Sequence, residues 1–218
     1  MGEWVRKLPY KMQKAIFERG YRKERSKKGY CCRDLWAMDD WFLNLIPKML
    51  REFREYSKTE AYPMSLFDAE WFEENKDRCF EVGIHDVDFF HNTDYDTLSD
   101  EQQKFYNEMD EYNKKRWFET LDRMIFLFEE ANEDTCSKKN PYEKEYMDFI
   151  SSTIPDKRRT KKELRERKKN PATGRDEEAD SKMQKLHFEE ELKLEEYRKQ
   201  CKDEAMALFT KYLHNLWL

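Results

Sequence analysis

The densest group of side chains that could do chemistry lies between Gly83 and Asp94. Imidazole and carboxylate groups suit zinc, iron or manganese, and this stretch carries five of them: His85, Asp86, Asp88, His91 and Asp94. A His-Asp pair is also typical of metal-dependent phosphohydrolases, but that metal set needs an earlier histidine, and none precedes His85. The stretch has no convincing helical pattern. We therefore interpret it as a solvated acidic loop and expect neither a metal ion nor another cofactor.

Signatures of nucleophilic or nucleotide-dependent catalysis are missing from the sequence. It contains no G-x-S-x-G elbow, no Walker A loop and no dinucleotide-binding glycine pattern. The odd number of cysteines, none in C-x-x-C spacing, fits neither a disulfide framework nor a zinc knuckle. They are Cys31, Cys32, Cys79, Cys136 and Cys201. We therefore expect a protein of a reducing cytoplasm and rank an enzyme below every binding function.

A second group of side chains has the chemistry of a small-molecule pocket. Aromatic rings can stack on a nucleobase, and a cation beside them can hold a phosphate. The candidate ligand-binding residues come from the two most aromatic segments: Arg33, Trp36, Asp39, Lys211, Tyr212 and Trp217. The alternative is structural. In that interpretation Asp34 caps a helix, Asp39 joins a buried ion pair, and the C-terminal aromatic residues end a core helix.

Charge is strongly segregated along the chain, although the net charge is only −5. Residues 1–30 carry +7, residues 68–148 carry −14 and residues 149–175 carry +7. Such segregation either pairs within the fold or produces faces of opposite sign. A phosphate backbone could bind the basic segments 19–28 and 157–169, the latter through Lys157, Arg158, Lys161, Lys162, Arg165, Lys168 and Lys169. No aromatic residue is interleaved in the second segment, so we rank nucleic acid below other partners.

Helical periodicity predicts an all-α fold, a four- to five-helix bundle with a long C-terminal helix. Apolar side chains recur three or four residues apart in five segments. These are 3–19, 34–53, 100–132, a shorter helix after Pro141, and a final helix from near Ser181. The chain has 15 Phe, 12 Tyr and 6 Trp, which can supply a core despite 41% charged residues. Ser99 and Gln102 have the spacing of a capping box at the start of the third segment.

We predict one helical domain over 1–218 with two irregular parts. The first is an acidic excursion at 64–98, with at most one short helix near 68–79, and the second is a charged linker or arm at 155–180. The helix over 34–53 is apolar on most sides, so we expect it to be packed centrally and kinked at Pro47. No run of 18 apolar residues occurs, so we expect no membrane-spanning segment.

Three stretches carry a resemblance to known proteins. They are G-Y-C-C-R-D-L-W-A-M-D at 29–39 leading into I-P-K-M-L at 46–50, W-x-x-x-L-D-R-M-I-F-L-F at 117–128, and L-F-x-K-Y-x-x-x-L-W at 208–217. In this order they resemble a family of small, functionally uncharacterised proteins of tailed bacteriophages. Cys32 stands where that family often has an acidic residue, and Leu218 replaces its usual final Asp. The resemblance implies a phage origin and the cytoplasm of an infected bacterium, but no reaction.

Three hypotheses about function follow. The first is a non-enzymatic binder in the infected cell, such as an anti-defence protein that sequesters a nucleotide-type signal. The second is a structural or protein-interaction module without a small ligand, whose long last helix pairs with a host protein or with a second copy. The third is a nucleic-acid accessory protein that acts through the basic arms. We rank them in this order.

Overall fold

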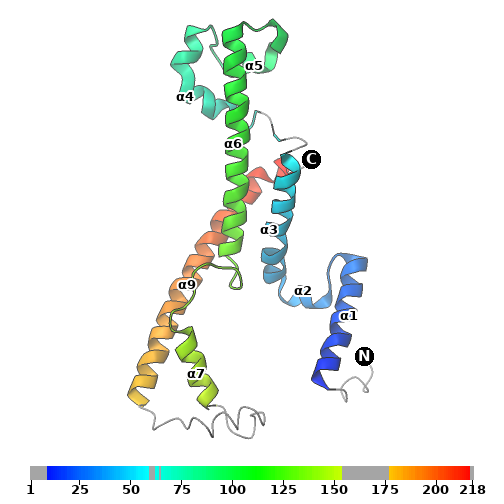
Figure 1. The fold of residues 1–218 in the computed structure, drawn as a ribbon, viewed down its shortest axis with the longest axis vertical. Coiled ribbons are helices and arrows are strands. Elements are labelled where there is room, and N and C mark those ends of the chain that lie inside the picture. Colours follow the sequence, from blue (N-terminus) through cyan, green and yellow to red (C-terminus); the bar gives the residue numbers. More distant parts are fainter. Residues whose placement is uncertain (1–8, 59–61, 64, 154–176, 217–218) are drawn as a thin grey trace. The chain divides into compact units, whose positions relative to one another are not determined.

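The structure, a computed structural model, describes residues 9–58, 62–63, 65–153 and 177–216. The all-α prediction is confirmed: within these residues there are eight α-helices, two short 3-10 helices and no strand (Figure 1). The helices are α1 (Tyr10–Lys28), α2 (Cys32–Trp36), α3 (Met38–Ser57), α4 (Asp68–Glu81), α5 (Asp88–Asn92), α6 (Asp100–Glu130), α7 (Glu143–Thr153) and α9 (Glu177–Tyr212). The 3-10 helices are η2 (Tyr95–Thr97) and η4 (Leu213–Asn215).

The chain divides into two compact units. The first consists of Met1–Ile125 with His214–Leu218, and the second of Phe126–Leu213. Helix α6 contributes to both, because the division falls five residues before its end. Each unit has buried apolar side chains of its own.

The core of the first unit is formed by α4, α5 and the N-terminal half of α6, beside which α4 and α5 lie (Figure 1). Its buried members are Trp71, Phe72, Cys79, Ile84, Phe90, Phe105 and Met109. Aromatic side chains pack edge to face within it, as Trp71 does against Phe90 and Phe105, with ring centroids 6.2 and 6.1 Å apart. These contacts link three helices that carry mostly acidic residues on their other faces.

The segment 64–98 is mainly helical, so our expectation of an irregular excursion was wrong apart from the short helix that we placed near 68–79. Helix α4 ends in a Schellman motif: Gly83 has φ +78°, its N–H donates to Phe80 O at 3.1 Å, and Ile84 N–H donates to Cys79 O at 2.9 Å. Cys79 and Ile84 are both fully buried. The motif turns the chain back so that α5 reaches the same core.

The beginning of α6 follows the predicted capping box. Ser99 N–H donates to Gln102 Oε1 at 3.1 Å, and Gln102 N–H donates to Ser99 Oγ at 3.3 Å. The helix then runs to Glu130, two residues short of the predicted end. The reciprocal bonds satisfy two backbone donors at the first turn, which is why this start could be located from sequence.

The N-terminal helices differ from the prediction in two ways. Helix α1 continues through Gly20 to Lys28, so the basic stretch 22–28 is helical rather than a connector. The predicted helix over 34–53 is two helices, because Ala37 leaves helical geometry at φ −133° and ψ 58°. Helix α3 is also not packed on several sides: its buried residues are Pro47, Leu50 and Ser57, while Met38 and Met49 are exposed. Its apolar composition exceeds the surface that neighbouring elements cover.

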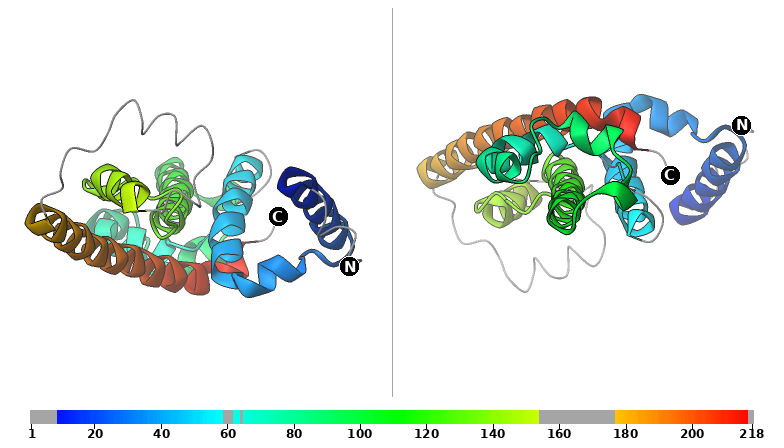
Figure 2. Two further views of the ribbon diagram at one scale, coloured as in Figure 1. Left: turned by 90° about the horizontal axis from the view of Figure 1, so that it is seen from below. Right: turned by 90° about the horizontal axis from the view of Figure 1, so that it is seen from above.

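The second unit contains the end of α6 together with α7 and α9, and α7 lies beside α9 (Figure 2). Leu194, Cys201, Ala205 and Tyr212, all on the stripe predicted for the last helix, are buried. Helix α9 begins at Glu177, four residues before the predicted start. Residues 177–180 of the predicted arm are therefore helical, and 155–176 lie outside the described residues.

Candidate functional site

The connection from α1 to α2 is built by glycine and an ion pair. Gly29 ends α1 with φ +80°, and its N–H donates to Arg25 O at 2.8 Å. A positive φ of this size favours glycine because a Cβ would meet the backbone. Arg25 then reaches across the turn: its Nε donates to Asp34 Oδ2 at 2.9 Å, and its terminal nitrogen forms a second bond to Oδ1.

Asp34 fixes the start of α2 as well as its attachment to α1. The Cys31 N–H donates to Asp34 Oδ2 at 2.7 Å, which makes Asp34 the third residue of a capping box begun by Cys31. The sequence indicated Asp34 as the cap itself; it caps from inside the helix instead. The two bonds from Arg25 hold the pKa of this buried carboxyl well below its usual range. A bidentate pair of this kind is a strong, directional attachment.

The break at Ala37 leaves Trp36 as the last residue of α2, with 92% of its surface exposed. Its neighbours Leu35 and Met38 are 54% and 59% exposed. We call these three residues the Trp36 surface. A helix that is held by a buried ion pair thus presents three apolar side chains to solvent, and the apolar pattern of the sequence had suggested burial here.

The predicted ligand-binding residues are distributed over both units. Arg33, Trp36 and Asp39 belong to the first unit, and Asp39 is exposed rather than part of the buried ion pair that we considered. Lys211 and Tyr212 end α9 in the second unit, where the Lys211 Nζ lies 4.9 Å from the ring centroid of the buried Tyr212. Trp217 lies outside the described residues. Two cavities in the first unit, lined from residues 65–113 and 100–111, contain none of the five described side chains.

The candidate metal ligands at 83–94 have separate structural contacts. Asp86 Oδ1 accepts from Phe89 N–H at 2.9 Å, and Asp94 Oδ1 accepts from Asp96 N–H at 3.2 Å, so both carboxylates cap helical turns. The His85 ring lies 5.6 Å from that of Phe80, and Asp88 begins α5. His91 pairs instead with Asp68 of α4. Among the described residues, no three or more His, Cys, Asp or Glu side chains are grouped to hold a metal ion.

The two basic segments are represented unequally. Helix α1 carries eight Lys or Arg and two Glu between Tyr10 and Lys28, and none of its residues is buried. It therefore places a net charge of +6 directly before the Trp36 surface. The second segment lies outside the described residues, including all seven side chains of the predicted stripe from Lys157 to Lys169.

Comparison with known proteins gives no match. Neither a protein-family model, nor a curated protein, nor a solved structure is similar to this chain. None of the helices in the described ranges is both long and apolar enough to cross a membrane. Function must therefore be argued from the chemistry of the residues themselves.

Proposed function

We propose that this is a non-enzymatic binding protein, and that the Trp36 surface attaches it to an acidic partner protein. The observation that carries the proposal is the nearly complete exposure of Trp36 on a short helix anchored by Arg25 and Asp34. Tryptophan is among the residues most enriched at interface hot spots, where its large ring fills a pocket on the partner. Leu35 and Met38 beside it enlarge the apolar contact.

The anchoring of α2 supports tight binding because it reduces the entropy lost on association. Asp34 fixes both the first turn of the helix and its link to α1, so the backbone that carries Trp36 is already ordered before a partner arrives. An indole has only two side-chain torsions to immobilise. Burial of such an anchor commonly contributes about 2 kcal/mol or more to the binding free energy.

Charge favours an acidic partner. Helix α1 carries a net +6, and the exposed Arg33 extends this basic surface to α2. Basic residues at the rim of an interface attract a partner of opposite charge and accelerate association. A protein fits better than a nucleic acid, because single-stranded nucleic acids use rows of aromatic rings for stacking, whereas Leu35 and Met38 have no ring to offer.

The proposed setting is the cytoplasm of an infected bacterium, as the phage resemblance implies, with an anti-defence role against a host protein. Sequestration of a nucleotide-type signal has weaker support. Trp36 and Asp39 are exposed at helix ends, whereas a nucleotide pocket needs a concave apolar wall with a few convergent polar groups. A homo-oligomer or a nucleic acid would be recognised by the same experiment.

The test is a photo-crosslinker, benzoylphenylalanine, placed at position 36 and, as a control, at the exposed Phe188 on α9. We expect crosslinks in infected cells to one acidic protein from position 36 and not from position 188. With that partner purified, Trp36→Ala should weaken binding by about 30-fold, equivalent to about 2 kcal/mol. Phe188→Ala should leave the affinity within twofold.

Three outcomes would contradict the proposal. Crosslinks to nucleic acid would favour the accessory function, and crosslinks to a second copy would favour an oligomer. Equal crosslinking from positions 36 and 188 would remove any special role of the Trp36 surface. Native mass spectrometry with linear and cyclic nucleotides tests the remaining alternative, since a bound nucleotide would restore the pocket hypothesis.

A further inference from the structure

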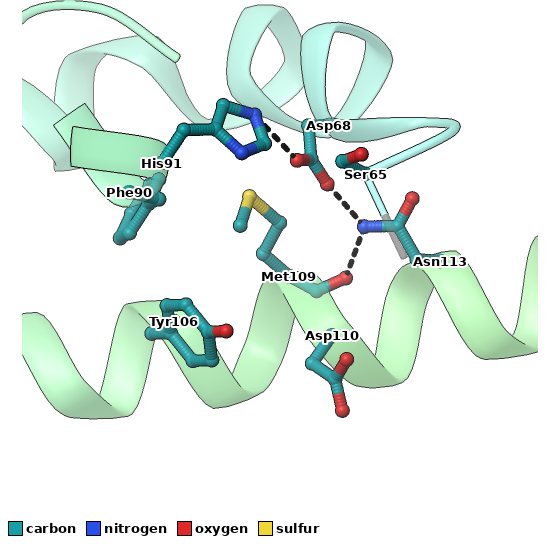
Figure 3. Close-up of a pocket in the computed structure, with 8 residues that line it drawn as sticks. All are labelled: Ser65, Asp68, Phe90, His91, Tyr106, Met109, Asp110 and Asn113. Carbon is teal, nitrogen blue, oxygen red and sulfur yellow. Dashed lines mark hydrogen bonds and ion pairs between the residues drawn. The ribbon is translucent and has the colours of Figure 1, made fainter. Parts of the chain in front are cut away.

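A cavity of about 110 Å³ lies between α4, α5 and α6 in the first unit (Figure 3). It has room for several water molecules, and thus for a small ligand head group. Its walls come from three segments that are far apart in the sequence: Ser65, Asp68, Phe90, His91, Tyr106, Met109, Asp110 and Asn113. The Schellman turn at Gly83 makes the site, because it brings the residues of α5 back over α4.

Asp68 is the most deeply placed charged group in this cavity, since only 4% of its side chain is exposed. Its Oδ2 lies 3.1 Å from His91 Nε2, and its Oδ1 accepts from Asn113 Nδ2 (Figure 3). The amide of Asn113 is itself held by Met109 O at 2.9 Å and by Phe67 N–H at 2.7 Å. Asp68 is thus held in one orientation, and burial raises the pKa of its carboxyl.

The cavity holds more negative than positive charge. Asp110 is its second carboxylate and accepts the hydroxyl of Tyr62. None of the described residues that line the cavity is Lys or Arg, and His91 is the only group there that can become cationic. Residues 68–113 carry 15 acidic residues against three Lys or Arg, a net −12 with His neutral. A buried carboxylate in such surroundings gains most from a cation that can donate hydrogen bonds.

The remaining walls are suited to an organic cation. The rings of Phe90 and Tyr106 line the cavity with their centroids 6.0 Å apart, and the thioether of Met109 lies beside them. Aromatic faces attract ammonium and guanidinium groups, and they do so more strongly where water is excluded. A metal ion fits less well, since no group of three or more metal-type ligands is found in the described part of the chain.

We propose that this cavity binds the ammonium or guanidinium head of a cationic ligand, with Asp68 and Asp110 as acceptors and Phe90 and Tyr106 as walls. The same head group occurs in free amines and in Lys or Arg side chains of another protein. The site is independent of the Trp36 surface, which uses other helices and recognises a partner of the opposite charge. Either proposal can fail without the other.

The test is an NMR titration of the full chain with methylguanidinium and with methylammonium at constant ionic strength. We expect saturable shifts of the His91 and Tyr106 ring signals, since both rings line the cavity. Asp110→Asn and Asp68→Asn should each weaken binding at least tenfold. Asp77→Asn is the matched control, because it removes the same charge from an exposed position on α4 outside the cavity, and binding should stay within twofold.

Two results would overturn the proposal: linear, unsaturable shifts in the wild-type chain, or equal weakening by Asp77→Asn and Asp110→Asn. Either would reduce the effect to general attraction by an acidic surface. If Asp68→Asn does not fold, the Asp110 variant and the wild-type titration still decide. A blocked peptide with a single Arg distinguishes the sources: tighter binding than methylguanidinium indicates a protein side chain, and weaker binding indicates a free amine.

Discussion

Glu130 connects three parts of the second unit, and its removal allows a quantitative prediction. Only 4% of this residue is exposed. Its carboxylate accepts from Ser137 N–H at 2.9 Å, from Ser137 Oγ at 2.8 Å and from Tyr197 Oη at 2.9 Å. It therefore joins the end of α6, the turn that follows it and the middle of α9. Glu130→Ala would leave a buried N–H and two hydroxyl groups without their acceptor.

The expected cost follows from the number and kind of these bonds. A hydrogen bond to a charged acceptor contributes about 1.5–3 kcal/mol, and the contributions of three bonds to one group do not add fully. Removal of the carboxylate also removes its own desolvation cost. We therefore expect Glu130→Ala to destabilise the second unit by about 3 kcal/mol, and Tyr197→Phe, which loses one of the three bonds, by about 1.5 kcal/mol.

Hydrogen exchange is the suitable assay, because all six Trp residues lie outside 126–213 and fluorescence does not monitor this unit directly. Exchange in peptides from 131–140 and from α9 should accelerate in both variants, in the ratio of the two costs. Peptides from α4 and α5 serve as the internal control and should be unaffected. The reasoning is refuted if Glu130→Ala changes protection by less than about 0.5 kcal/mol, the range of ordinary surface substitutions.

The same carboxylate predicts a pH dependence. Burial raises the pKa of Glu130, but the bonds donated by Ser137 and Tyr197 outweigh this and leave the pKa below its ordinary value of 4.5. A depressed carboxyl pKa contributes stability above the unfolded value that is lost as pH falls through the folded value. Protection in the second unit should therefore decline below pH 4.5 in the wild type and decline less in Glu130→Gln.

Three further predictions concern the first unit. Asn113→Ala should destabilise it by about 2–3 kcal/mol in chemical denaturation followed by Trp fluorescence, because it leaves the buried Phe67 N–H without its acceptor. Asp34→Asn should loosen the start of α2 by about 1 kcal/mol, measured as faster amide exchange over 30–36, since it weakens both the cap and the pair with Arg25; unchanged exchange would count against an anchored Trp36 surface. Alkylation should modify Cys32 first, because the other four cysteines are buried; two thiols reacting equally fast in native protein would disagree with the structure.

Sequence patterns predicted the elements that carry their own local signals. The capping box of Ser99 and Gln102 located the start of α6, and the spacing of Leu194, Cys201 and Ala205 located the buried stripe of α9. Helix α5 was missed because it has only five residues, too few for a periodic pattern. Gly83 was the available signal, since a glycine after an amphipathic stretch commonly ends a helix and reverses the chain.

The functional residues were harder to predict, because exposure and long-range contact leave little trace in periodicity. Trp36 lies in the most apolar stretch of the sequence, and nothing in the spacing marks the break at Ala37 that leaves it exposed. Asp68 and His91 are 23 positions apart, and their contact exists only because the chain turns back at Gly83. His91 was recognised as a polar candidate, but its carboxylate partner was sought within the same loop.

The crowd of carboxylates on α4, α5 and the first half of α6 has a consequence for the folded state itself. Fifteen acidic residues share residues 68–113 with three Lys or Arg, so these helices repel one another even as their aromatic core holds them together. Salt limits that repulsion to about 8 Å at physiological ionic strength, but dilution to 0.01 M extends it to about 30 Å, far enough to reach across the whole cluster. Dissolved cations therefore act as a structural component of this unit, and its compactness is a property of the medium as much as of the chain.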